Sequence, residues 1–110
     1  MATQSHTDVR AGRMVDSIIL KMPEASLRVE EDFRLYLESG ICSFSGFYLA
    51  LVENNLWQAH RRADAKNLER LDEWLSWMYW HFPAKAWGGP EAIRDFEGIA
   101  AMEIPEQNRR

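Results

Sequence analysis

Two places in this chain have residue types that could do chemistry. His60 and Asp64 stand four residues apart, and on a helix that spacing puts both side chains on one face, as two metal ligands require. No third ligand is evident, and Asp64 also suits a helix N-cap. Cys42 precedes a predicted helix whose dipole favours a thiolate, but no general base can be assigned to it. We interpret His60 as a surface side chain and Cys42 as a small buried one, and we expect no metal, no cofactor and no enzymatic activity.

Composition narrows the class of protein further. The chain has 110 residues and 13 Lys and Arg against 17 Asp and Glu, a formal charge of −4. This length supports one hydrophobic core, and the acidic balance argues against nucleic acid as the main partner. A single cysteine allows no internal disulfide, the apolar runs are too short for a bilayer, and the first residues lack a signal-peptide pattern. We expect one soluble cytoplasmic domain that does not engage a membrane.

Helical periodicity dominates the chain and predicts an all-α fold, a compact bundle of four to five short helices. We expect the helical domain to span 12–103, between a disordered N-terminal segment, 1–11, and a disordered tail, 104–110. The predicted helices cover 12–22, 25–39, 47–63 and 66–82, with a short one that begins at Pro90 and ends at Gly98. Residues 17–21 also fit a short strand, although we favour the helix.

Apolar residues at helical spacing predict which faces form the core. In the second helix they are Val29, Phe33, Tyr36 and Leu37, and Gly40 follows as a C-cap. In the third they are Tyr48, Leu51, Val52, Leu56, Ala59 and Ala63. In the fourth they are Leu68, Leu71, Leu75, Met78 and Phe82, with Asp64 as the N-cap.

Tryptophan is the feature that these core faces explain least. Trp57, Trp77 and Trp80 fall off the predicted faces of two consecutive helices. Large aromatic side chains in such positions are typical of protein interfaces. The alternative is that the N-terminal helix, or the segment around Trp87, covers this side and makes the rings part of the core. We predict a partner-binding surface formed by Trp57, Arg61, Arg70, Glu73, Trp77 and Trp80.

Two partner classes fit this surface. The first is a protein, either foreign or a second copy of the chain, bound by a non-enzymatic interaction module. The alternative is a nucleic-acid-binding regulator that uses Arg61, Arg62 and Arg70, whose binding would weaken steeply as salt rises.

The stretch from about Leu35 to Phe96 also carries a family pattern. Its residues are Gly40, Gly46-Phe47, Ala50-Leu51, Asn54-Asn55-Leu56, Ala59, Ala63-Asp64, Asn67, Trp77, Tyr79, Pro83 and Trp87-Gly88. Together they resemble small uncharacterised helical proteins of tailed bacteriophages and prophages, which more often have Asn-Asp-Leu and Trp-Gly-Ser at two of these places. The resemblance implies an accessory protein in a bacterial cytoplasm that binds a host or phage protein, with blocking of a host defence, as anti-CRISPR proteins do, as the expected role.

Overall fold

The computed structural model describes residues 6–102 and is built of helices joined by turns. Within this range there are seven α-helices, two 3₁₀ turns and no strand. They are α1 (His6–Leu20), α2 (Leu27–Ser39), α3 (Gly46–Val52), α4 (Leu56–Arg62), α5 (Ala65–Glu69), α6 (Leu71–His81), η1 (Ala84–Ala86), α7 (Pro90–Asp95) and η2 (Ile99–Ala101). The all-α prediction is confirmed. The prediction of four to five helices is too low: there are seven shorter α-helices among the described residues, because two of the predicted helices are each broken in two.

The first helix is confirmed as a helix but starts earlier than expected. It begins at His6 rather than Gly12, so residues 6–11, expected to be disordered, are helical. Ala11 and Val15 are buried in the core at 4% and 1% exposure. Packing of these side chains stabilises turns that the sequence alone makes only weakly helical. The disorder expected for 1–5 and 104–110 concerns residues outside the described range.

The second helix follows the prediction closely. Phe33, Tyr36 and Leu37 are fully buried, and Val29 packs against the core half-buried. Gly40 adopts the left-handed conformation, with φ of 79°, and its N–H donates to the Tyr36 carbonyl at 2.7 Å. This is the predicted C-cap.

The helix predicted over 47–63 is wrong in its length. Asn54 adopts a left-handed conformation with φ of 57°, and the Asn55 side chain accepts a 3.1 Å hydrogen bond from the N–H of Gln58. Asparagine tolerates that conformation and competes for backbone donors, so the pair ends α3 and starts α4. Leu56, predicted to be buried, is therefore 54% exposed.

The helix predicted over 66–82 is broken at Arg70, whose φ and ψ are −108° and 17°. The Asp64 cap before α5 is confirmed, since its carboxylate accepts from the N–H of Asn67 at 2.8 Å. The predicted leucine face is only partly correct. Met78 and Phe82 are buried and Leu71 and Leu75 are half-buried, but Leu68 is 42% exposed. The break rotates α6 relative to α5, and the large rings of Trp74 and Trp77 take the central core positions.

The C-terminal part keeps its predicted start and changes its end. Pro90 stands at the first helical position of α7, as predicted. The helix ends at Asp95 and not at Gly98, because Phe96 leaves the helix to bury its ring at 6% exposure. The following turn, η2, packs against α1 and α2.

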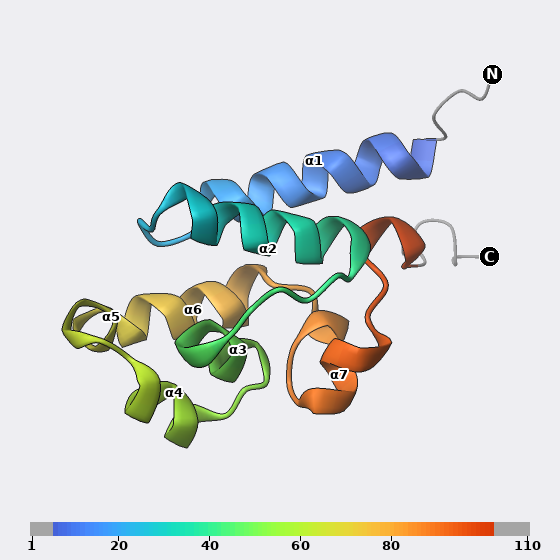
Figure 1. Cartoon of the computed structure of the whole chain (residues 1–110). Helices are drawn as coiled ribbons and strands as arrows, with labels where there is room; N and C mark the ends of the chain where they lie inside the picture. The colour runs from blue at the N-terminus through green and yellow to red at the C-terminus, as the bar shows by residue number, and fades with distance from the viewer. Residues whose placement is uncertain (1–5, 103–110) are drawn as a thin grey trace.

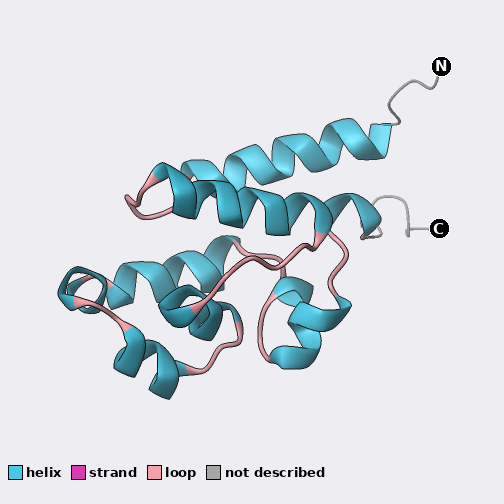
Figure 2. Ribbon diagram, in the orientation of Figure 1, coloured by secondary structure: helices cyan, strands magenta, loops and turns pink. Residues whose placement is uncertain are grey.

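The helices form two layers (Figures 1 and 2). α1 and α2 lie side by side as an antiparallel pair, and α6 lies beneath them with α3, α4 and α7. Phe33 of α2 is central to the core between the layers, with ring centroids 4.6 to 6.1 Å from those of five other aromatic side chains. These are Phe44, Tyr48, Trp74, Trp77 and Phe82. None of the described helices has the length and apolar character needed to cross a bilayer.

Candidate protein-binding surfaces

The residues first considered for chemistry do not converge in the structure. Cys42 is exposed, which corrects the expectation of a buried thiol, because the segment between α2 and α3 runs over the surface. His60 is exposed on α4, as predicted, and the Asp64 carboxylate is occupied as a helix cap. Among residues 6–102, no group of three or more His, Cys, Asp or Glu side chains is arranged to hold a metal ion.

Four of the six predicted partner-binding residues do come together. Arg70, Glu73, Trp77 and Trp80 line one groove with a volume of about 560 Å³, between α6 and the turn that joins α1 to α2. We call this the α6 groove. Its remaining lining residues are Lys21, Met22, Pro23, Glu24, Ser76 and His81.

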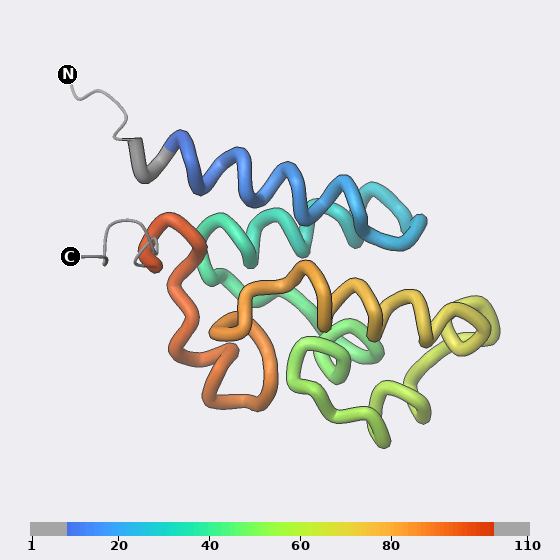
Figure 3. The backbone as a smooth tube through the Cα atoms, turned by 180° about the vertical axis from the view of Figure 1, so that it is seen from behind, coloured from blue at the N-terminus to red at the C-terminus, as the bar shows by residue number. Residues whose placement is uncertain are grey.

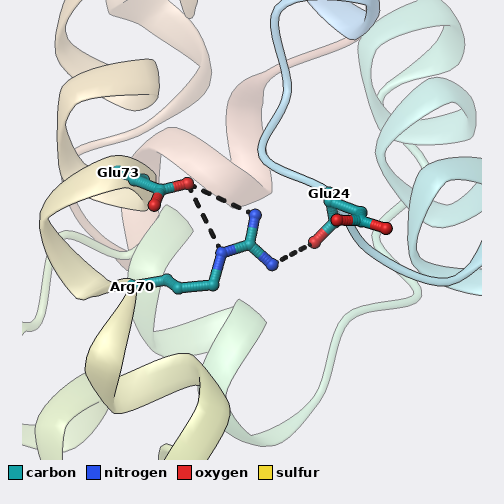
Figure 4. Close-up of polar contacts among 3 residues, drawn as sticks. All are labelled: Glu24, Arg70 and Glu73. Atoms are coloured by element: carbon teal, nitrogen blue, oxygen red, sulfur yellow. Dashed lines mark hydrogen bonds and ion pairs between the residues drawn. The ribbon is translucent and has the colours of Figure 1, made fainter.

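Arg70 fixes one wall of the α6 groove (Figure 4). Its Nη1 donates to the backbone carbonyl of Glu24 at 2.6 Å, and its Nε and Nη2 donate to Oε1 of Glu73 at 3.4 and 3.3 Å. The side chain is 19% exposed. Arg70 therefore connects the α1–α2 turn to α6 and holds the shape of the groove, and it is not a free cation.

Trp77 corrects the prediction most directly. It was expected on an outward face, but it is only 3% exposed, and its indole N–H donates to the Ile18 carbonyl at 2.8 Å. Its ring also meets Phe33 edge-on at 5.0 Å. The N-terminal helix α1 covers this ring, which is the alternative that the sequence left open. Trp77 forms the floor of the groove.

Trp80 lies at the exposed rim of the α6 groove. It is 72% exposed, as predicted from its place off the core face. Tyr79 beside it is 68% exposed, and the two rings are perpendicular with centroids 4.8 Å apart. Sequence reasoning did not select Tyr79 as a binding residue, although its place next to Trp80 on the polar side of the helix was the available signal.

Trp57 and Arg61 form a second surface on α4. Trp57 is 67% exposed, and the guanidinium carbon of Arg61, one turn further on, lies 5.7 Å from its ring centroid. That geometry is a cation–π contact, which at an exposed site favours this arrangement by roughly 0.5 to 1 kcal/mol. The pair does not line the α6 groove. Figures 1 and 3 show α4 at the opposite edge of the molecule from α1, so the single predicted surface is two surfaces.

The chain matches no protein-family model, no curated protein and no solved structure.

Proposed function

We propose that this protein is a non-enzymatic protein-binding module. The observation that carries the proposal is the exposure of Trp57, Tyr79 and Trp80, at 67%, 68% and 72%, in a chain whose core already holds many aromatic rings. Tryptophan, tyrosine and arginine are the residues that most often dominate the free energy of protein association. Each of these rings that becomes buried on binding contributes about 2 kcal/mol to the free energy of association, which supports a stable complex.

The α4 surface suits a foreign protein partner. The seven residues of α4 include Arg61, Arg62 and His60 and no acidic side chain, whereas the whole chain has a charge of −4. Arginine binds carboxylates in a bidentate manner, so the preferred partner presents an acidic side chain beside an apolar one. Because the cation–π contact already favours this arrangement of Trp57 and Arg61, binding loses less of their conformational entropy.

The resemblance to phage and prophage proteins supplies the setting of the proposal. We propose a bacterial cytoplasm as the place of action and a host protein as the partner, blocked as anti-CRISPR proteins block theirs. The support is the residue pattern given above, together with an exposed aromatic surface of the kind that an inhibitor needs.

Capture from a bacterial lysate with immobilised protein tests this function. The wild type should retain a specific protein that Trp57→Ala loses, while the circular dichroism of the variant matches that of the wild type. The matched control is Leu27→Ala, which truncates an exposed apolar side chain on a different helix, α2, and should retain the partner. Failure of the wild type to retain any specific protein, or equal capture by Trp57→Ala, would contradict the proposal.

Nucleic-acid binding is the second candidate function, and α4 is its best support. Arg61 lies over the exposed Trp57 ring, and an aromatic ring beside a cation is typical of single-strand binding. Arg62 is also exposed, although its Nη1 donates a 3.4 Å hydrogen bond to the carbonyl of Gly46. Arg70, however, is held by Glu24 and Glu73 and is not available to a phosphate. Fluorescence anisotropy with a labelled oligonucleotide distinguishes the candidates, because binding to phosphate falls steeply between 50 and 200 mM salt. A flat or absent signal would eliminate this alternative.

A further inference from the structure

We propose that the α6 groove is occupied by α6 of a second copy of this chain, in a two-fold symmetric dimer. This inference goes beyond the proposed function, because it assigns one of the two surfaces to self-association and leaves the α4 surface for the foreign partner.

The shape of the α6 groove favours a second copy of the chain as its occupant. In a two-fold dimer the same patch must supply both the projecting group and the hollow that receives it. The α6 groove has both: Trp80 projects from its rim at 72% exposure, and the floor beside it is formed by Trp77 and the apolar side chains of Met22 and Pro23. Two such patches facing each other bury two indole rings at once.

The spacing of residues along α6 also favours a second helix as the occupant. Glu73, Ser76 and Trp80 line the groove, are exposed, and stand at the i, i+3 and i+7 positions of one helix face. Trp77, at i+4, is already covered by the chain's own α1 and forms the floor beneath them. Ser76, at the middle of this face, is small and exposed, so it permits close approach of a second helix. When an antiparallel copy of α6 is centred midway between Ser76 and Trp77, Trp80 of one copy lies beside Glu73 of the other.

The charges of the α6 groove also permit a second copy to bind. The groove carries Lys21 and Arg70 against Glu24 and Glu73, so its formal charges balance, whereas the whole chain carries −4. Two copies therefore meet at a patch that does not repel itself. Arg70 and Glu73 already pair with each other within the chain, which leaves the exposed Lys21 and Glu24 as opposite charges that a second copy can complement.

The dimer leaves the proposed binding surface available. α4 lies at the edge of the molecule opposite α1, whereas the α6 groove is bordered by the end of α1 (Figure 3). One dimer therefore presents two Trp57–Arg61 pairs and can engage two copies of a partner, or a symmetric partner, with increased avidity.

Light scattering of the purified protein over a dilution series is the direct test. The expected mass is twice that of the 12.8 kDa chain, falling toward the monomer only at the lowest concentrations. Ser76→Arg, which places a long charged side chain at the centre of the packing face, should give a monomer. Ala65→Arg adds the same charge at an exposed position on α5 and should remain a dimer. Trp80→Ala should weaken the dimer by at least about tenfold in Kd.

A cross-linking measurement keeps the test decisive if Ser76→Arg unfolds. In a Cys42→Ser background, Ser76→Cys should be joined into a covalent dimer by a short bismaleimide, and Ala65→Cys should not. A wild type that stays monomeric at every concentration would overturn the inference, as would equal cross-linking of the two cysteines. Neither result affects capture of a partner by the α4 surface, so the failure of the dimer and the failure of the proposed function are distinguishable.

Discussion

The indole N–H of Trp77 donates a 2.8 Å hydrogen bond to the carbonyl of Ile18 and so joins α6 to the last turn of α1. The same carbonyl accepts from the N–H of Lys21 at 3.2 Å. Trp77 is thus held by both packing and a directional contact, while Trp80, one turn further on, is 72% exposed.

Trp77→Phe should lower the free energy of unfolding by about 1 to 3 kcal/mol, because the hydrogen bond is lost and the smaller ring leaves a cavity. Trp80→Phe removes the same atoms from an exposed side chain and should change the monomer's stability by less than about 0.5 kcal/mol. Urea unfolding of both variants in the Ser76→Arg background, where self-association is blocked, makes the comparison. Equal losses of stability would place both rings in the same environment and contradict the structure.

Gly40 and Gly98 allow two backbones to pass at close range. A Cβ on Gly40 would lie 2.7 Å from Cα of Glu97, and a Cβ on Gly98 would lie 2.7 Å from the carbonyl carbon of Glu38. Both glycines also have positive φ, at 79° and 104°. Gly40→Ala and Gly98→Ala should therefore each cost more than about 2 kcal/mol in thermal or urea unfolding.

Gly12 is the matched control for those substitutions. A Cβ there meets nothing within 4 Å, and the residue lies inside α1. Gly12→Ala should raise the free energy of unfolding by about 0.5 to 1 kcal/mol, since alanine is the better helix former. Destabilisation by Gly12→Ala as large as that by Gly40→Ala would show that close backbone contact is not the cause.

The Tyr36 hydroxyl, which donates to the carbonyl of Ala86, should make stability depend on pH at the alkaline end. Burial raises the pKa of Tyr36, and the charge of nearby Cys42 raises it further, so the folded state favours the neutral phenol. This contribution is complete below the unfolded-state pKa of about 10 and is lost as pH rises above it, because the unfolded chain then releases the proton more readily.

Tyr36→Phe separates the two effects of that hydroxyl. It should cost about 1 to 3 kcal/mol near neutral pH by leaving the Ala86 carbonyl without its donor. The variant should also lack the part of the stability loss at high pH that comes from ionisation of Tyr36. Its urea midpoints measured at about pH 8 and pH 11 should therefore differ less than those of the wild type. An equal loss of stability at high pH in the variant and the wild type would show that other groups cause it.

Arg70 should contribute more through Glu24 than through Glu73. Arg70→Ala removes a 2.6 Å hydrogen bond to a backbone carbonyl and the packing of a side chain that is 19% exposed, and we expect a loss of about 1 to 2 kcal/mol. Glu73→Gln removes only the charge of a carboxylate that is 60% exposed and should cost less than about 0.5 kcal/mol. A larger effect for Glu73→Gln in urea unfolding would reverse this assignment.

The ends of helices were predictable from the sequence wherever a single residue sets the local backbone conformation. The Gly40 cap, the Asp64 cap and the Pro90 start are all present, because each depends on interactions within one turn. The buried face of α2 was predictable for a similar reason, since its apolar side chains lie on one continuous helix.

The two helix breaks were not predicted, and they explain most of the errors in the core. Hydrophobic periodicity continues through Asn54 and Arg70, so it predicts unbroken helices. Each break changes the orientation of one part of the predicted helix relative to the other, so the two parts no longer share one buried face. Leu56 after the first break and Leu68 before the second are therefore exposed, and Trp77 after the second is buried. The position of α1 over this side, given by packing far along the chain, completes the burial of that ring.

By itself the sequence determined the helical class and the caps, because helical period and turn chemistry are local properties. It placed Trp57, Trp77 and Trp80 off the predicted core faces alike, and only packing decided that Trp77 is buried while the other two are exposed. Only the tertiary structure decided that Arg70, Glu73, Trp77 and Trp80 share one groove, while Trp57 and Arg61 form a separate surface on α4. That division depends on how the segments around the breaks are oriented and on which neighbour covers each face. Both are set by long-range packing of side chains, which no local pattern of residues specifies.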